Sequence, residues 1–250
     1  MPSLVPKSLV VFLEDWGWSR LEERLAGSAL PFVAGLAGQG RAGPLAAGPM
    51  SRFPWSRLLA RGLRLGLFNP PGLARPRPLS GFMVCRRRGG NGDFTHPPEL
   101  AQDLADYPPA PSWTWQDGLA GLSRGRRDSL FAEQALYSRL GLEQCRRLFR
   151  RFAVDVALVG WRGPGVMRRL FPERQKRRGI YLAQLDRHIH QLVQDLEPGL
   201  VLVLGLDPGD GPHGLVAWGQ GGAGRRRELP ASWDQVLDMI PQGAGEGAEA

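Results

Sequence analysis

The chain has 250 residues, a length that suits one α/β domain and is enough to bury a sizeable core. Hydrophobic residues make up 42% and charged residues 22%, which is ordinary globular usage and excludes a chain that is disordered throughout. The formal net charge is +8 and comes largely from arginine, so we expect the surface to attract anions.

Three features of the sequence favour a cytoplasmic protein. The longest apolar stretches, LVVFL and GLVLVLGL, are far shorter than the roughly 20 residues that a membrane-spanning helix needs. The opening MPSLVPKSLVVFLEDWGW has one lysine, and acids break its apolar run, which is not the pattern of a signal peptide. The two cysteines, Cys85 and Cys145, indicate neither a disulfide scaffold nor a zinc cluster.

Arginines gather in short groups along the chain. The groups lie at 86–88, 146–147, 150–151, 168–169, 174–178 and 225–227. Such groups could bind phosphates, nucleic acid or anionic lipid, or they could reflect an arginine-rich composition. They are scattered and lack interleaved aromatic residues or a known nucleic-acid motif, which favours composition.

The N-terminal quarter predicts a β-loop-α opening followed by shorter elements. SLVVFL (8–13) is a strand, and WSRLEERL (18–25) has apolar residues at helical spacing. ALPFVAGLAGQG (29–40) predicts a short helix closed by glycine. PWSRLLARG (54–62) predicts a third helix and LRLGLF (63–68) a strand.

The next segment is irregular in sequence. Its proline density predicts a surface loop over 69–80, and 81–128 reads as an insertion or lid. Trp113 and Trp115 lie in this insertion. They either pack inside the lid or stack on a ligand base.

The second half alternates apolar strands with amphipathic helices. LFAEQALYSRLGLEQCRRLFRRF (130–152) and IYLAQLDRHIHQLVQDL (180–196) have helical periodicity. VDVALVGW (154–161), LVLVLGL (200–206) and GLVAWG (214–219) are runs of strand type. This alternation predicts an α/β fold whose mostly parallel sheet carries helices on both faces.

We expect this α/β domain to span 1–222. Residues 223–250 then form a C-terminal segment that ends in a disordered, low-complexity tail, QGAGEGAEA. Ligands of such sheets bind beyond the carboxyl ends of the strands. The polar side chains that follow the strands therefore supply the candidate site.

Carboxylates follow two of the predicted strands. Glu14 and Asp15 follow the first strand, and Asp207 follows the strand at 200–206, with His213 a few residues later. Carboxylate oxygens together with a histidine suit Zn²⁺, Mn²⁺ or Mg²⁺. Each residue also has a structural interpretation: Asp207 could cap the following turn, Glu14 and Asp15 could favour the next helix N-terminus, and His213 could be an ordinary loop residue.

The remaining histidines and the cysteines give weaker signals. His188 and His190 are two residues apart on one predicted helix, so they face different sides and do not form a joint site. Cys145 falls on the apolar face of its helix and is interpreted as packing. Cys85 stands beside three arginines, which could lower the pKa of its thiol, but no partner base is visible, which favours packing here too.

The order of the segments resembles the alkaline phosphatase superfamily, in particular its type I phosphodiesterase/nucleotide pyrophosphatase branch. VVFLEDWGWSRLEERLAGSALPFVAGLAGQGRAGPL resembles the family's opening strand and first metal-binding acid. PWSRLLARGLRLGLFNPPGLARPRPLSGFMV and DFTHPPEL resemble two later segments. DVALVGW, YLAQLDRHI, LVLVLGLDPG and GLVAWG resemble its last strands and a helix between them, so the likeness spans most of 8–220.

The resemblance implies a site with two metal ions, usually zinc, that activate a threonine or serine nucleophile. The family's first acid falls at Glu14, with Asp15 adjacent. The nucleophile should precede the PWSRLLARG segment, and Ser51 is the only hydroxyl in that interval. Ser51 is therefore a weak candidate for the nucleophile.

Other positions depart from the family pattern. The Asp-His pair expected after DVALVGW falls in RGPGVMRRLFP, which contains neither residue. Asp207 is retained, but Pro208 stands where a ligand histidine belongs, and proline has no donor atom for a metal. The family's last histidine corresponds best to His213. One complete metal site is therefore expected to be missing.

The leading hypothesis is a degenerate, non-catalytic or very weakly active family member. It would bind a protein partner or an anionic, phosphate-containing ligand over the old site, ringed by Arg162, Arg168 and Arg169. The alternative is a metal-dependent phosphodiesterase or phosphatase with one zinc or other divalent ion. The ion would be held by Glu14, Asp15, Asp207 and His213. A third hypothesis, supported only by charge, is a nucleic-acid-associated basic protein.

Overall fold

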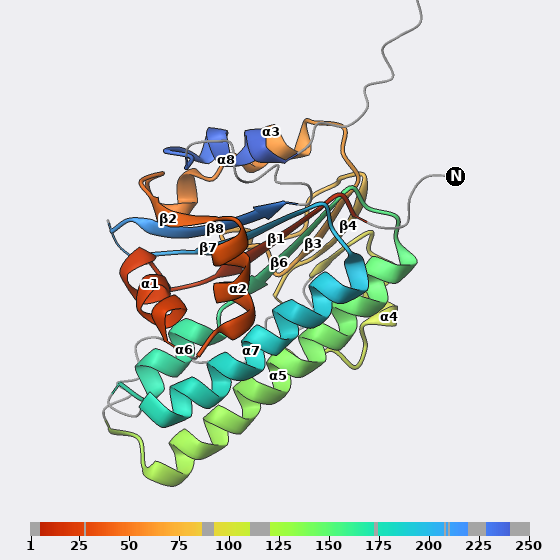
Figure 1. Ribbon diagram of the computed structural model, residues 1–250. Coiled ribbons are helices and arrows are strands. Elements are labelled where there is room, and N and C mark those ends of the chain that lie inside the picture. The colour runs from red at the N-terminus through yellow and green to blue at the C-terminus, as the bar shows by residue number, and fades with distance from the viewer. Residues whose placement is uncertain are drawn as a thin grey trace, which may run out of the picture.

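The protein has an α/β fold in which helices cover both faces of one sheet (Figure 1). The computed structural model describes residues 6–27, 29–86, 93–110, 121–172, 175–207, 209, 211–219 and 229–240. Within these ranges the sheet has eight strands in the order β2-β8-β7-β1-β6-β3-β4-β5. None of the helices in these ranges is long and apolar enough to cross a bilayer.

The sheet is mixed. Its strands are β1 (Ser8–Leu13), β2 (Arg41–Leu45), β3 (Leu65–Phe68), β4 (Gly81–Val84), β5 (Thr95–His96), β6 (Val156–Trp161), β7 (Leu200–Gly205) and β8 (His213–Gly219). The central neighbours β7, β1, β6, β3 and β4 run parallel, as expected. β8 is antiparallel to β7 and β2, and β5 to β4. The connection 206–212 is too short for the crossover that a parallel pair needs, so β8 returns as a hairpin partner of β7.

The two faces of the sheet carry unequal layers. The helices are α1 (Trp18–Ala26), α2 (Pro31–Gln39), α3 (Trp55–Leu59), α4 (Leu100–Asp103), α5 (Arg124–Arg151), α6 (Gly163–Leu170), α7 (Gln175–Leu196) and α8 (Trp233–Met239), with a 3₁₀ turn η1 (Met50–Arg52). The long helices α5 and α7 cover one face with α1, α2 and α6, whereas α3 and α8 cover the other (Figure 1). Alternate residues of β1 serve the two cores: Leu9, Val11 and Leu13 face the first, and Val10 and Phe12 the second.

Two segments are more regular than the sequence indicates. The predicted insertion or lid at 81–128 supplies β4, β5 and α4, whose few residues each are too short to show a period. In the C-terminal segment, α8 packs on the sheet, where Trp233 and Leu237 are buried in the second core. Trp113, Trp115 and the tail at 241–250 lie outside the described residues.

Candidate functional site at the carboxyl edge of the sheet

The ends of three adjacent strands meet at one edge of the sheet. In the parallel register, Leu13 at the end of β1 pairs with Trp161 of β6 on one side and with Gly205 of β7 on the other. Glu14 and Asp15 therefore emerge between the residues that follow β6 and β7. The sequence places these strand ends together correctly, and the surrounding side chains decide what they can do.

Glu14 is held by an arginine from another strand. Arg86, two residues after the end of β4, donates from Nη2 to Glu14 Oε1. The side chains of Glu14 and Arg86 are only 18% and 24% exposed, so the pair is largely shielded from water. The carboxylate is thus already neutralised by a guanidinium.

Asp15 is held by α6. Arg169 donates from Nη2 to Asp15 Oδ2. Asp15 has a φ of +61°, and its carboxylate lies against Gly165, where an added Cβ would come within 2.3 Å of Oδ2. Gly165 therefore allows α6 to sit on the carboxylate, and Arg169, one turn further along this helix, compensates its charge.

Asp207 caps the turn that leads from β7 to β8. Its Oδ1 accepts hydrogen bonds from the N–H groups of Gly209 at 2.9 Å and Gly211 at 3.3 Å. Its other oxygen packs on Gly17, where a Cβ would lie 2.3 Å away. These contacts favour the capping interpretation of Asp207. Pro208, expected in place of a ligand histidine, lies outside the described residues.

His213 has structural partners on both ring nitrogens. The N–H of Asp207 donates to Nδ1 at 2.8 Å, and Nε2 lies 2.5 Å from the carbonyl oxygen of Gly48. The ring is 1% exposed and lies 4.9 Å from the ring of Trp233. These distances assign the proton to Nε2 and leave no lone pair of the neutral ring for a metal. His213 therefore fixes the β7–β8 turn rather than standing in a flexible loop.

The four predicted ligands do not fit a metal ion as they are arranged. Glu14 and Asp15 are paired with arginines, and Asp207 and His213 with backbone groups. Among the described residues, no three His, Cys, Asp or Glu side chains come together in a way that could hold a metal. A cation at this edge would have to displace at least one guanidinium. The metal site stays a prediction for metal analysis to test.

The surroundings support neither Ser51 as a nucleophile nor a reactive thiol at Cys85, for which the sequence favours packing. Ser51 lies in η1 with an exposed side chain, and within the described ranges its hydroxyl has no hydrogen bond to a histidine or carboxylate. Cys85 is buried, and burial raises the pKa of its thiol to about 11, so a lowered pKa at this position is wrong. Burial likewise raises the pKa of Cys145, as expected for a packed cysteine.

The three arginines expected to ring the old site lie around α6 and face different neighbours. Arg162, which precedes α6, lines a cavity over β3 and β6. Arg169 is paired with Asp15. Arg168 faces a separate pocket toward α1 and α7. The structure thus divides the predicted ring into two cavities with an ion pair between them.

The cavity beside Arg162, here called the edge cavity, is lined by residues of β3, α5, β6 and α6. Phe68 and Trp161 form part of its apolar wall. Arg86, Tyr137 and Arg162 bring polar groups to it. An apolar cavity with a few converging polar groups at the carboxyl ends of parallel strands is the usual form of a ligand site.

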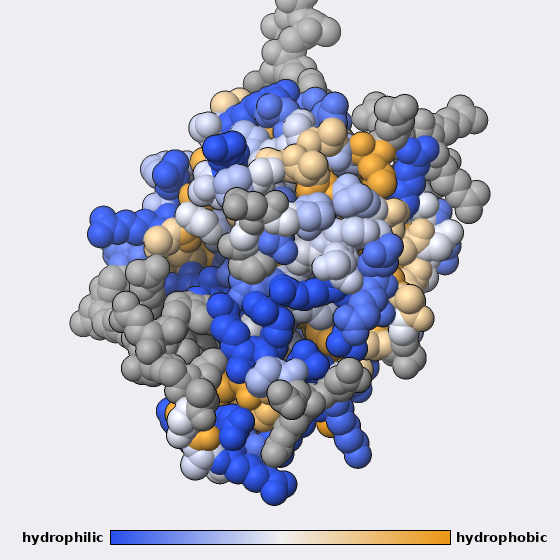
Figure 2. Space-filling view, turned by 90° about the vertical axis from the view of Figure 1, so that its left-hand side faces the viewer, coloured by the Kyte–Doolittle hydropathy of each residue, from blue (hydrophilic) through white to orange (hydrophobic). Residues whose placement is uncertain are grey.

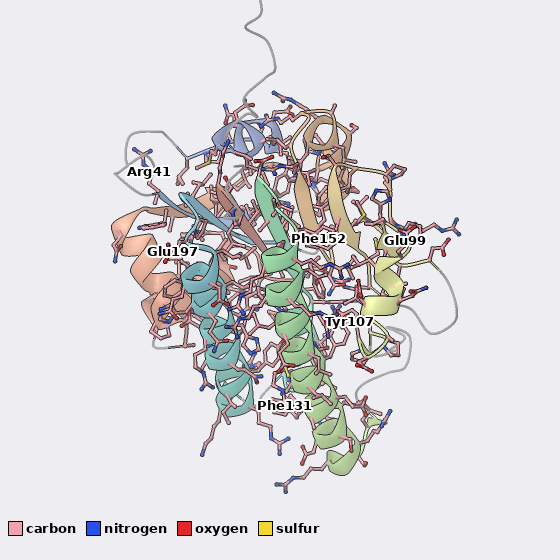
Figure 3. All side chains as sticks on the ribbon, turned by 90° about the vertical axis from the view of Figure 1, so that its right-hand side faces the viewer. Arg41, Glu99, Tyr107, Phe131, Phe152 and Glu197 are labelled. Carbon is pink, nitrogen blue, oxygen red and sulfur yellow. The ribbon has the colours of Figure 1, made fainter. Side chains whose placement is uncertain are left out.

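A hydrogen-bond chain of three side chains supports the edge cavity. Asn69, at a φ of +51° after β3, donates from Nδ2 to Tyr107 Oη at 2.9 Å, and Tyr107 donates to Tyr137 Oη at 2.7 Å. Tyr107 lies beside α5 (Figure 3), with its ring 5.5 Å from that of Tyr137. Burial raises the pKa of both tyrosines, so they stay protonated. Since Tyr137 Oη accepts from Tyr107, its own proton can be offered to a ligand oxygen.

No family model matches the chain, and no curated protein matches it. The resemblance to the type I phosphodiesterase branch therefore remains an expectation from the sequence. The arginine groups at 87–88 and 225–227, and Arg174, lie outside the described residues.

The arginines along α5 are largely engaged in ion pairs. Arg146 and Arg150 bind Asp195 of α7, and Arg151 binds Asp103 of α4. These pairs fasten α5 to its neighbours and reduce the positive charge of this surface. They give little support to a nucleic-acid surface along this helix.

Proposed function

We propose that the protein binds a phosphate-containing anion in the edge cavity and does not hydrolyse phosphate esters efficiently. It would then be a degenerate relative of the type I phosphodiesterase branch. The observation that carries this proposal is the pairing of Glu14 with Arg86 and of Asp15 with Arg169. Guanidinium groups stand where that family's chemistry needs metal cations.

The edge cavity suits a phosphate ester with an apolar or aromatic group. Guanidinium groups bind phosphate oxygens through paired N–H donors, and Arg162 reaches the cavity, whereas Arg86 at the cavity wall is paired with Glu14. Tyr137 adds a hydroxyl donor, while Phe68 and Trp161 provide an apolar wall for the organic part.

Efficient hydrolysis has little support, because covalent phosphoryl transfer needs a nucleophile next to a base or a metal. Ser51 has neither among the described residues. His213, which lies at the edge, has both ring nitrogens occupied by backbone groups. A ligand in the cavity would therefore be held rather than converted.

Calorimetric titration of the purified protein with phenyl phosphate tests the binding proposal. We expect saturable binding that weakens at least tenfold in Arg162→Gln. The matched control is Arg187→Gln, which removes the same charge from an exposed position on α7 and should change the affinity less than twofold. No saturable binding, or an equal loss in both variants, would overturn the proposal.

Metal content and hydrolysis test the competing enzyme hypothesis on the same sample. We expect far less than one metal per chain and no turnover of bis(4-nitrophenyl) phosphate above that of zinc or manganese alone. One bound zinc per chain, with turnover that is lost in Asp207→Asn, would replace our proposal with a one-metal phosphodiesterase.

A further inference from the structure

A second cavity lies across α6 from the edge cavity, between α1, α6 and α7. This cavity is here called the arginine pocket. Its charged lining consists of Arg20, Glu23, Arg24, Arg168 and Arg178, and Trp16 also lines it. The face of the molecule that carries α1 has a broad band of hydrophilic side chains (Figure 2).

The cations of the arginine pocket outnumber its acids. Arg24 makes a 3.1 Å ion pair with Glu23, whose side chain is 60% exposed and therefore a weak partner. Arg20 donates to the backbone carbonyl of Asp15 at 3.0 Å, which positions its guanidinium without neutralising it. Within the described residues, Arg168 and Arg178 have no ion pair, and the Nε of each is buried without a hydrogen-bond partner.

The crowding of positive charge opposes the folded state around Arg168. Burial lowers the pKa of its guanidinium, and the charges of Arg20 and Arg178 lower it further. The carboxylates Asp15 and Asp207 act in the opposite direction without contacting it closely enough to form an ion pair. Because arginine stays protonated in proteins, an unrelieved repulsion remains that a bound anion would remove.

We propose that the arginine pocket is a binding site for a diphosphate group. Arg20 and Arg24 are one helical turn apart on the same face of α1, with Cβ atoms about 5–6 Å apart. Arg168 and Arg178 approach from α6 and α7 on the other sides of the pocket. Two linked phosphates can contact both turns of α1 and still face the other two arginines, so the pocket is better matched to a diphosphate than to a single phosphate.

This site is separate from the edge cavity, and its occupancy does not depend on the proposed function. The edge cavity uses Arg162 and an apolar wall, whereas the arginine pocket has guanidinium groups on three helices. The two sites can therefore be tested with different ligands and different variants of the same protein.

Calorimetric titration with inorganic pyrophosphate at pH 7.5 and constant ionic strength, in metal-free buffer, tests the proposal. We expect one saturable site per chain and at least tenfold weaker binding in Arg168→Gln and in Arg178→Gln. Arg187→Gln, on the same helix as Arg178, is the matched control and should bind within twofold of the unchanged protein. Arg178→Lys keeps the charge without the planar fork and should give an intermediate loss.

Three results would overturn the proposal: no saturable binding of pyrophosphate, an equal loss in Arg187→Gln, or a loss caused by Arg162→Gln rather than by the pocket variants. Thermal unfolding of each variant confirms that it is folded, and Arg178→Lys keeps the test decisive if a Gln variant fails to fold. A parallel titration with ADP identifies the source of the group. Tighter binding of ADP indicates a nucleotide tail, and tighter binding of pyrophosphate a free anion.

Discussion

Arginines on the two sides of α6 differ in whether they have an acidic partner. On the side of β1, each carboxylate of the sheet edge has an arginine of its own: Glu14 has Arg86 and Asp15 has Arg169. On the side of α7, Arg168 and Arg178 have no acidic partner within the described ranges. A paired charge can contribute to the fold, whereas crowded like charges without an acidic partner cost stability unless an anion binds to them. The contrast distinguishes the paired carboxylates of the sheet edge from the arginine pocket, which we propose binds a diphosphate.

Removing the ring of His213 should have the largest effect on stability of the proposed changes, and it tests whether His213 has a structural role at the carboxyl edge. We expect His213→Ala to lower the free energy of unfolding by about 4 kcal/mol, since it opens a cavity beside Trp233 and leaves the N–H of Asp207 and the carbonyl of Gly48 unpaired. Urea unfolding measures this loss.

Added zinc provides the control for His213. If the edge is structural, zinc will not raise the melting temperature of the unchanged protein, because a ligand stabilises only the state that binds it. A loss below about 1 kcal/mol in His213→Ala would show that His213 does not stabilise this turn. A zinc-dependent rise in melting temperature that the variant abolishes would make His213 a metal ligand.

The pH dependence of stability tests the packing of α7, the helix that carries Arg178 and also the buried His188. Burial lowers the pKa of His188 to about 4, below its ordinary value of 6.5. The unfolded chain therefore binds a proton more readily than the folded one, so the stabilising contribution of neutral His188 is complete above pH 6.5 and falls as the pH drops toward 4. The loss approaches about 3 kcal/mol at 1.36 kcal/mol per unit.

Urea unfolding at several pH values measures the effect of His188. His188→Gln should have a flatter stability profile between pH 6.5 and 4 than the unchanged protein. Identical slopes would mean that His188 does not set the acid response. The arginines keep their charge over this range, so binding to the arginine pocket is best compared at pH 7.5.

The sequence predicts the long strands of this fold better than the short strands and the side-chain contacts between distant segments. β1, β6 and β7 are continuous apolar runs because both of their faces are buried, and their order along the chain places Glu14, Asp15 and Asp207 at one edge. β4 and β5 have too few residues for any periodicity, so they were expected to be part of an irregular insertion.

What the side chains at the carboxyl edge can bind depends on contacts between residues that are far apart in the sequence, which no local sequence pattern predicts. Arg86 lies 72 residues from Glu14, and Arg169 lies 154 residues from Asp15. Tyr107 stands in a proline-rich loop, and only the fold brings it to Tyr137. One local signal could have indicated the contact between α6 and Asp15. Gly165 allows α6 to approach the Asp15 carboxylate, and the GPG of RGPGVMRRLFP is a pattern that permits such a close approach.

Breaking the ion pair between Asp15 and Arg169 tests whether the paired charges at the sheet edge stabilise the fold. We expect Asp15→Asn to lower the free energy of unfolding by about 2 kcal/mol, because it removes the carboxylate from a partly buried ion pair with Arg169. The loss is smaller than for a fully buried pair because the Arg169 side chain is 30% exposed. Asp15→Asn combined with Arg169→Gln should recover part of it. A double variant as unstable as the sum of the single variants would show that the two residues do not act together.

The smallest expected effect on stability is a slight increase, and it tests the arginine pocket. Without ligand, Arg178→Gln should leave stability unchanged or raise it by up to about 0.5 kcal/mol, because one like charge leaves a crowded cluster. With pyrophosphate, the melting temperature of the unchanged protein should rise while that of Arg178→Gln stays nearly constant, since only the intact pocket gains binding energy. A variant that is destabilised without ligand and still responds to pyrophosphate would place Arg178 among the structural arginines and remove the contrast across α6.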